Sequence, residues 1–352
     1  MRVSFFSNSL AFTAILTCAS ALAACRTPDQ PESSAEQSVD VRCDGRQAAD
    51  IVTRDLERIA DLPKKVGILL PNKSALYYHL AMREPHEAPA DHRIYYGTNL
   101  QQFGDLRIPK GQGPFPVAVV IHGGGWSSSV GLHYMAPTAA SLTCAGVATW
   151  NIEYRRLGSG GEWPGLLEDV AAATDFLREI ALKYPLDLSS GVVSLGHSAG
   201  GHLALWLAMR HRLSSDSELY RPNPLPIRGA VSMDGVPDLF NFVEDVPSYA
   251  ARFEQLFGAH GASKETFARR IRDASPESHL PLGVRQLLLQ GNPGSTPPVG
   301  CCGIPEYVVK AQKMGDRVEY ILVDGFHFEP VDPSNHQSGP AVRNAVRSMS
   351  GL

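Results

Sequence analysis

Two glycine-rich turns, each preceded by a short run of apolar residues, constrain the fold of this chain most strongly. The first turn is His122–Trp126 and the second is Gly196–Gly200. From Ser198 to Met209 the sequence is almost uniformly apolar, which predicts a buried helix that begins at the serine. A strand, a tight turn and a helix in this order lift a serine hydroxyl above a sheet, and the first turn is typical of loops that offer backbone N–H groups to an oxyanion. An ordinary glycine-rich turn with a surface serine is the alternative interpretation.

Apolar runs and helical patterns alternate over the rest of the chain. The stretch Leu166–Tyr184, for example, is a predicted helix. The alternation predicts an α/β domain with a mostly parallel central sheet and helices on both faces. Its expected extent is residues 88–352, a normal size for one open α/β sheet. We expect strands at 92–97, 104–109, 116–121, 146–152, 191–195, 227–233, 286–290 and 317–323.

The N-terminus predicts export. Met1-Arg2 precedes an uncharged run that is long enough to span a bilayer and ends in Leu22-Ala-Ala-Cys25, which resembles the lipobox of bacterial lipoproteins. The resemblance implies a signal peptide over 1–24 and a lipid on Cys25. An ordinary cleaved signal and an uncleaved anchor are the alternatives. Arg26 takes the place of the Asp that retains lipoproteins in the inner membrane, which favours the periplasmic side of the outer membrane of a bacterial cell envelope.

Two segments separate this signal from the domain. Residues 25–43 are rich in Pro, Ser, Gln and Glu, which predicts a flexible tether. Residues 44–87 begin with an amphipathic helical pattern and are expected to form an N-terminal helical extension, either over the site or on the back of the domain. The net charge of −4, with both signs interspersed, argues against nucleic acid as a partner. No zinc-spaced cysteine set or phosphate-binding glycine loop is present, so no metal or organic cofactor is expected.

Residues 88–340 resemble the α/β-hydrolase superfamily, and most closely its esterase/acetyl-esterase branch near the arylformamidases and the prolyl-oligopeptidase-like hydrolases. The resemblance implies an α/β-hydrolase fold and serine chemistry, but it is a poor guide to substrate because this fold hosts many acyl substrates. Besides the two turns, the matching residues are Asp105-Leu106, Asn151–Leu157, Trp163-Pro164, Asp169-Val170, Ser275-Pro276, Pro281–Gly283, His327-Phe328 and Asp332-Pro333.

The resemblance implies that Ser198 is the nucleophile and His327 is its base. A serine hydroxyl needs a base to take its proton, and His327 follows the last expected strand and a glycine-containing turn, where the family has its last triad member. The oxyanion donors implied are the N–H groups of Ala199, Gly124 and Gly125.

Two further histidines flank the glycines. His122 and His197 are expected to organise the loops through hydrogen bonds rather than to act as bases.

The carboxylate of the triad is missing from its usual place. The family has it in a Gly-x-x-Asp turn after the strand before last, where this chain has Gly294, and residues 278–305 contain no acid. Asp234 follows the strand 227–233, and some α/β hydrolases take their acid from the end of this strand. The hypothesis is that Asp234 replaces the lost acid and orients His327. Asp238 is the competing candidate. Alternatively, Asp234 is only a turn or cap residue, and the protein is an enzyme with a catalytic dyad or is inactive.

Cysteine usage adds an expectation. Removal of the signal and lipidation leave Cys43, Cys144, Cys301 and Cys302, and an exported chain favours disulfides. Cys301 or Cys302 pairs with Cys43 or Cys144, or both remain free thiols.

These features together predict a lipid-anchored carboxylesterase that cleaves small or medium acyl esters through an acyl-enzyme on Ser198. The alternatives are an amidase, peptidase or arylformamidase on the same machinery, and a non-catalytic protein that retains the fold. The expected partners are a small-molecule acyl substrate and, through Cys25, a membrane.

Overall fold

The computed structural model describes residues 89–128, 130–258, 261–292 and 303–352. The predicted signal peptide (1–24), tether (25–43) and helical extension (44–87) lie outside the described residues, and so do Cys43, Gly294, Cys301 and Cys302. In the described ranges no helix has the length and the apolar character needed to cross a bilayer.

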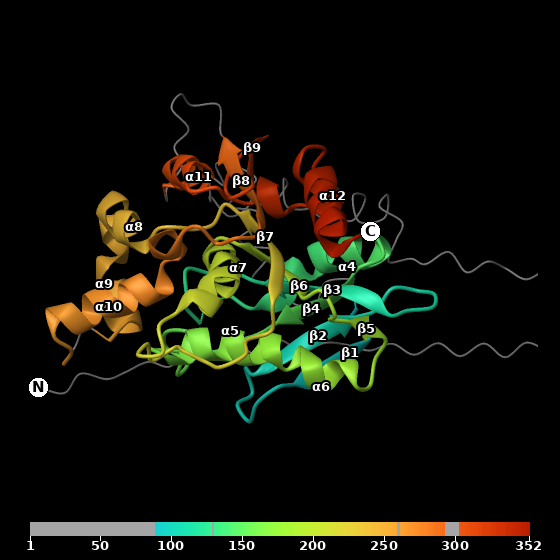
Figure 1. The fold of residues 1–352 in the computed structure, drawn as a ribbon, viewed down its shortest axis with the longest axis horizontal. Coiled ribbons are helices and arrows are strands. Elements are labelled where there is room, and N and C mark those ends of the chain that lie inside the picture. Colours follow the sequence, from blue (N-terminus) through green and yellow to red (C-terminus); the bar gives the residue numbers. More distant parts are fainter. Residues whose placement is uncertain (1–88, 129, 259–260, 293–302) are drawn as a thin grey trace, which may run out of the picture. The chain divides into compact units, whose positions relative to one another are not determined.

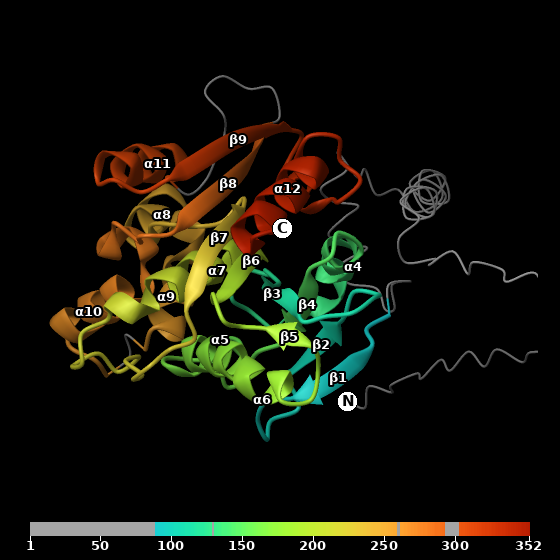
Figure 2. The ribbon, with the colours of Figure 1, turned by 45° about the vertical axis from the view of Figure 1, so that its right-hand side comes forward.

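A nine-stranded sheet forms the centre of the described chain (Figure 1). Eight strands follow the spatial order β1-β2-β4-β3-β6-β7-β8-β9, and a ninth, β5, pairs only with β3. The pairs β1–β2 and β2–β4 are antiparallel and all others are parallel. Figure 2 shows β1 at one end of the sheet and β9 at the other. The strands are β1 (His92–Tyr95), β2 (Phe103–Arg107), β3 (Phe115–Ile121), β4 (Ala148–Ile152), β5 (Leu186–Asp187), β6 (Val192–His197), β7 (Ile227–Met233), β8 (Arg285–Asn292) and β9 (Val318–Asp324).

The mostly parallel sheet confirms the predicted fold class. All eight expected strands are present, with ends that shift by two residues at most, and only the two-residue β5 was not expected. Successive side chains of β3 enter opposite cores: Val117 and Val119 belong to one, and Ala118 and Val120 to the other. Burial on both faces explains why such strands are continuously apolar rather than alternating.

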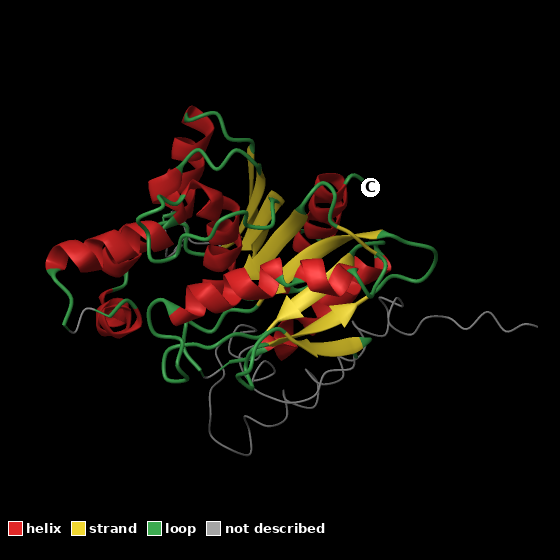
Figure 3. Cartoon of the chain, turned by 60° about the horizontal axis from the view of Figure 1, so that its bottom comes forward, coloured by secondary structure: helices red, strands yellow, loops and turns green. Residues whose placement is uncertain are grey.

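Helices cover both faces of the sheet (Figure 3). One face packs against α4 (Ala136–Cys144) and α12 (Ser338–Ser350). The other packs against α5 (Gly165–Asp175), α6 (Leu177–Ala181), α7 (Ala199–Met209) and α11 (Ile304–Lys313). The helix expected over 166–184 is therefore two helices. The break lies at Phe176, whose carbonyl accepts a hydrogen bond of the 3₁₀ type from the N–H of Glu179.

An insertion between β7 and β8, residues 239–274, adds α8 (Leu239–Asp245), α9 (Ala250–Leu256) and α10 (Lys264–Ala274), which lie together in Figure 1. It packs on the loop after β3 through Trp126. The indole of Trp126 is buried among aromatic rings of the insertion, with centroids 5.7 Å from Phe242, 6.2 Å from Tyr249 and 5.2 Å from Phe253. The insertion therefore borders the carboxyl edge of the sheet, where ligands bind in α/β folds. The short connecting helices are η2 (Leu132–Met135), η3 (Arg210–Arg212), η4 (Pro247–Tyr249), η5 (Pro276–His279) and η6 (Glu329–Val331).

Candidate active site

Ser198 occupies a strained turn between β6 and α7. Its backbone has φ 56° and ψ −123°, and its N–H donates to the carbonyl of Met233 at 2.9 Å. Four non-glycine residues of the described chain have positive φ, and three of them, Trp126, Ser198 and Asp234, lie in loops at the carboxyl edge of the sheet. Strained backbone of this kind persists where the surrounding structure enforces it, most often at functional sites.

Asp234 is the carboxylate that contacts the ring of His327. The Nδ1 atom of His327 lies 2.5 Å from Oδ2 of Asp234, and the N–H of Gly291 donates to the other oxygen at 3.3 Å. Asp234 is 8% exposed. With Nδ1–H donating to the carboxylate, Nε2 carries the lone pair, which is the tautomer that a general base requires.

The competing acid, Asp238, directly precedes α8 as its N-cap. Its Oδ1 accepts hydrogen bonds from the N–H groups of Phe240 at 2.9 Å and Asn241 at 3.3 Å, as helix N-termini require. Burial raises the pKa of Asp238. The carboxyl oxygens of Asp238 therefore serve the helix, whereas those of Asp234 serve the imidazole.

Gly291, at the end of β8, allows this arrangement. A Cβ there would lie 2.2 Å from the carbonyl oxygen of Phe326, so only glycine lets the loop that carries His327 lie against the strand. Gly291 corresponds to the first glycine of the family's Gly-x-x-Asp turn, and its N–H donates a hydrogen bond to Asp234.

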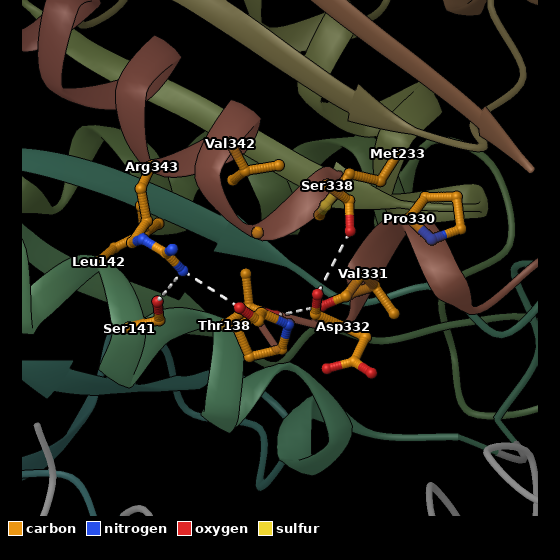
Figure 4. Close-up of a pocket in the computed structure, with 12 residues that line it drawn as sticks. Thr138, Ser141, Leu142, Met233, Pro330, Val331, Asp332, Ser338, Val342 and Arg343 are labelled. Atoms are coloured by element: carbon orange, nitrogen blue, oxygen red, sulfur yellow. Dashed lines mark hydrogen bonds between the residues drawn. The ribbon is translucent and has the colours of Figure 1, made fainter. Parts of the chain in front are cut away.

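The segment that follows His327 packs against α4 and α12, and Figure 4 shows Val331 of this segment beside Thr138 and Ser338. Thr138 donates to the carbonyl of Val331 at 2.7 Å, and Ser338 donates to that of Glu329 at 2.9 Å. Between these groups lies a cavity with a free volume of about 10 Å³, close to what one water molecule needs. This region therefore supports the loop and has no room for a substrate.

The loop after β3 lies directly against Ser198. A Cβ on Gly123 would lie 2.9 Å from Cβ of Ser198. The N–H of Gly123 donates to the hydroxyl of Tyr134 at 2.5 Å. In the described part of the chain, the N–H groups of Gly124, Gly125 and Ala199 have no protein acceptor. The three donors predicted from the sequence are therefore available to a substrate.

Tyr134 and His197 connect this loop to the loop of His327. The hydroxyl of Tyr134 lies 3.0 Å from Nδ1 of His197, and Nε2 of His197 lies 2.8 Å from the carbonyl oxygen of His327. The carbonyl can only accept, so Nε2 carries the proton and Nδ1 accepts from Tyr134. Burial, and then the neighbouring His327, hold the pKa of His197 well below its ordinary value, so the ring stays neutral. No sequence pattern indicates this role of Tyr134.

His122 belongs to a buried charge cluster beneath the same loop. Its Nε2 lies 3.1 Å from Oε1 of Glu153, which also accepts from Nη1 of Arg156 at 2.5 Å. Burial alone would raise the pKa of Glu153, but His122 and Arg156 outweigh it and lower the pKa to about 2. Arg156 donates to the carbonyl of Val130 at 2.6 Å, so the cluster fixes the loop's far end. His122 and His197 thus both make loop-organising hydrogen bonds.

The model of the BD-FAE family matches residues 105–286. The chain belongs to the BD-FAE family. The match includes Ser198, both glycine-rich turns and Asp234. His327 lies beyond the matched residues.

Two curated proteins are similar over parts of the sequence. The kynurenine formamidase of Meyerozyma guilliermondii is 28% identical over 171 residues, 49% of this chain and 61% of its own length. The non-reducing polyketide synthase adrD of Penicillium rubens is 31% identical over 121 residues, 33% of this chain and 4% of its own length. The chain therefore spans less than two thirds of both relatives.

Solved structures show the α/β-hydrolase fold of this BD-FAE protein. A truncated carbohydrate esterase from gut microbiota has a TM-score of 0.62 at 20% identity, over 77% of this chain and all of its own. Esterase B from Lactobacillus rhamnosis has a TM-score of 0.63 at 17% identity, over 86% of this chain and 96% of its own. A bacterial heroin esterase has a TM-score of 0.59 at 19% identity, over 79% of this chain and 89% of its own.

Proposed function

We propose that this BD-FAE protein is a serine carboxylesterase that cleaves small or medium acyl esters through an acyl-enzyme on Ser198. The observation that carries the proposal is the hydrogen bond between Asp234 and His327, at the edge of the sheet where Ser198 occupies the strained turn. Family membership and the esterases among the solved structures of the same fold support ester hydrolysis.

The proposed reaction has two halves. The Oγ of Ser198 attacks the ester carbonyl while Nε2 of His327 takes its proton, and Asp234 stabilises the imidazolium that forms. The carbonyl oxygen becomes negative and accepts from the three free N–H groups, each worth about 3 kcal/mol in the transition state. The C–O bond to the alcohol then breaks and His327 returns the proton to the leaving oxygen. Water, activated by the same imidazole, attacks the acyl-enzyme and releases the acid and Ser198.

Formamide hydrolysis is the second candidate. The similarity to a kynurenine formamidase favours it, since the same nucleophile, base and oxyanion donors cleave an N-formyl bond. The expected export of the chain argues against a cytosolic metabolite as its substrate.

The test combines a covalent probe with matched substrates. A fluorophosphonate should label the parent at Ser198 and leave Ser198→Ala unlabelled. Hydrolysis of 4-nitrophenyl esters of increasing acyl length, of the matching 4-nitroanilides and of an N-formyl arylamine then separates esterase, amidase and formamidase. A folded parent that the probe does not label would exclude the serine mechanism altogether, and with it every enzyme candidate above.

We propose further that the chain is a lipoprotein, with the signal over 1–24, lipid on Cys25, the tether over 25–43 and the extension over 44–87. A disulfide at Cys144 supports an oxidising compartment outside the cytosol. Full-length protein made in a Gram-negative host should incorporate labelled palmitate and sediment with outer membranes, whereas Cys25→Ser should do neither. Label that persists in Cys25→Ser would contradict the proposal.

A further inference from the structure

A guanidinium on the insertion lies beside the loop of oxyanion donors. Arg252, on α9, donates from Nη1 to the carbonyl of Gly125 at 3.3 Å, and the same nitrogen is 2.7 Å from where a Cβ on Gly125 would lie. Gly125 is one of the three donors on which the proposed reaction depends. The positive charge of Arg252 therefore stands at the edge of the reaction centre.

Tyr249 also lies next to Gly125. Its hydroxyl lies 3.0 Å from the Cβ position on Gly125, and its ring stacks under the guanidinium, with Cζ of Arg252 4.5 Å from the centroid. The contact of Tyr249 and Phe253 with Trp126 fixes this part of the insertion against the loop. The guanidinium is thus held in place before a substrate arrives, so little side-chain entropy is lost on binding.

No carboxylate neutralises this charge within the described residues. Arg270, on the same insertion, pairs with Glu218 at 3.1 Å, and Arg155 pairs with Asp169 at 2.7 Å. Arg252 is half-buried like these two, yet its partners are a carbonyl and an aromatic face. A partly dehydrated guanidinium with donors to spare attracts an anion more strongly than an exposed one does.

We infer that Arg252 and Tyr249 form a subsite for a carboxylate on the ester, so that this enzyme prefers esters whose acyl or alcohol part is anionic. The inference rests on the proposed esterase function and names the substrate class of that same site. The guanidinium offers two parallel donors that match a carboxylate, and the hydroxyl of Tyr249 offers a third.

The test uses two matched pairs of esters. In one pair the acyl part changes, from 4-nitrophenyl hexanoate to mono-4-nitrophenyl adipate. In the other the alcohol changes, from phenyl acetate to 4-carboxyphenyl acetate. The parent should favour the anionic member of one pair, which also shows which side of the ester meets Arg252. Added salt should weaken that preference, because it screens charges.

Variants test whether the preference for anionic esters depends on Arg252. Arg252→Gln should lower the ratio of kcat/KM on the anionic ester to kcat/KM on the neutral ester by roughly tenfold to a hundredfold, mostly through KM on the anionic ester. Arg252→Lys keeps the positive charge but lacks the two parallel N–H donors of the guanidinium, and it should lose less kcat/KM on the anionic ester. Arg269→Gln removes an exposed charge from α10 and should retain the preference. Urea midpoints establish that each variant is folded.

The measurements distinguish failure of the proposed subsite from failure of the proposed esterase function. Hydrolysis of the neutral esters and labelling of Ser198 with no anionic preference, or an equal loss in Arg269→Gln, would overturn the subsite alone. A parent that hydrolyses no ester and takes no label at Ser198 would overturn both the subsite and the proposed function.

Discussion

Asp234 and His327 are 93 positions apart in the sequence, and their carboxylate and imidazole are 2.5 Å apart in the fold. Asp234 follows β7 and His327 follows β9, so their contact crosses the end of β8. Gly291 ends the buried part of β8 with no side chain, and its N–H binds the second oxygen of Asp234. Asp234, at the end of the neighbouring strand, thus stands in the position that the proposed triad requires of its acid, and β8 contributes a backbone N–H alone.

The first prediction concerns Asp234. Asp234→Asn keeps the size of the side chain and tolerates the φ of 49° at this position, because asparagine also adopts left-handed backbone. The amide no longer selects the Nδ1–H tautomer of His327, so kcat on a 4-nitrophenyl ester should fall about a thousandfold or more. Initial rates at saturating ester measure it.

Asp238→Asn is the matched control. Asparagine begins helices about as well as aspartate, so α8 should persist and kcat should stay within a few-fold of the parent. If Asp234→Asn retains parental kcat, or if Asp238→Asn loses as much, the assignment of the triad acid is wrong.

Local patterns were sufficient to predict the sheet. β3 and β6 are short, apolar and β-branched, and each ends at a glycine-rich turn, so their type does not depend on distant contacts. Local patterns do not predict α8 and α9, because these helices are only seven residues long and are stabilised by aromatic contacts with Trp126 rather than by helical propensity.

The candidate site likewise contains some residues that local patterns indicate and others that they do not. Ser198, Gly124 and Gly125 can be proposed from the sequence because turn geometry imposes their residue types, and Asp234 because it directly follows a strand at the same sheet edge. Tyr134 and Arg252 cannot, because their contacts with His197 and Gly125 join segments that are distant in sequence. Periodicity cannot indicate which tyrosine reaches a backbone N–H.

The second prediction concerns Tyr134. Tyr134→Phe removes the hydroxyl that joins Gly123 to His197, which leaves a buried N–H and a ring nitrogen unpaired. We expect kcat to fall about tenfold with little change in KM, because the substrate gains no contact from this hydroxyl while the donors and His327 lose their alignment.

Tyr307→Phe is the control for Tyr134→Phe. Its hydroxyl donates to Gln286 at 2.7 Å, near the start of β8 and away from the carboxyl edge. This variant should lower the urea midpoint and leave kcat unchanged. A Tyr134→Phe enzyme that loses stability alone, as the control does, would make Tyr134 a structural residue only.

The third prediction is a pH dependence of stability from His202. Its Nδ1 accepts from the indole of Trp126 at 3.1 Å and its Nε2 donates to the carbonyl of Ala274 at 2.8 Å, so the folded chain needs the neutral ring. Burial lowers the pKa of His202 to about 4. As pH falls below about 6.5 the unfolded chain takes up a proton here and the folded chain does not. Stability is therefore full above that pH and is lost as pH falls towards 4, by about 3 kcal/mol.

His202→Gln isolates this contribution. Its amide does not titrate, so the difference in unfolding free energy between parent and variant should shrink by about 3 kcal/mol from pH 7 to pH 4 in urea titrations. A difference that stays constant over this range would show that the ring accepts its proton in the folded state as readily as in the unfolded one.

The last prediction concerns Cys144, the final residue of α4, which is disulfide-bonded. Protein purified from an oxidising compartment should resist alkylation at Cys144 under denaturing conditions until a reductant is added. Reduction should lower the unfolding free energy by about 2–4 kcal/mol, since the cross-link restricts the unfolded chain. Cys144→Ser should expose one new thiol, and peptide mapping then shows whether Cys43, Cys301 or Cys302 carries it. Full alkylation of Cys144 without reductant would contradict the disulfide, and with it the support that it gives to export.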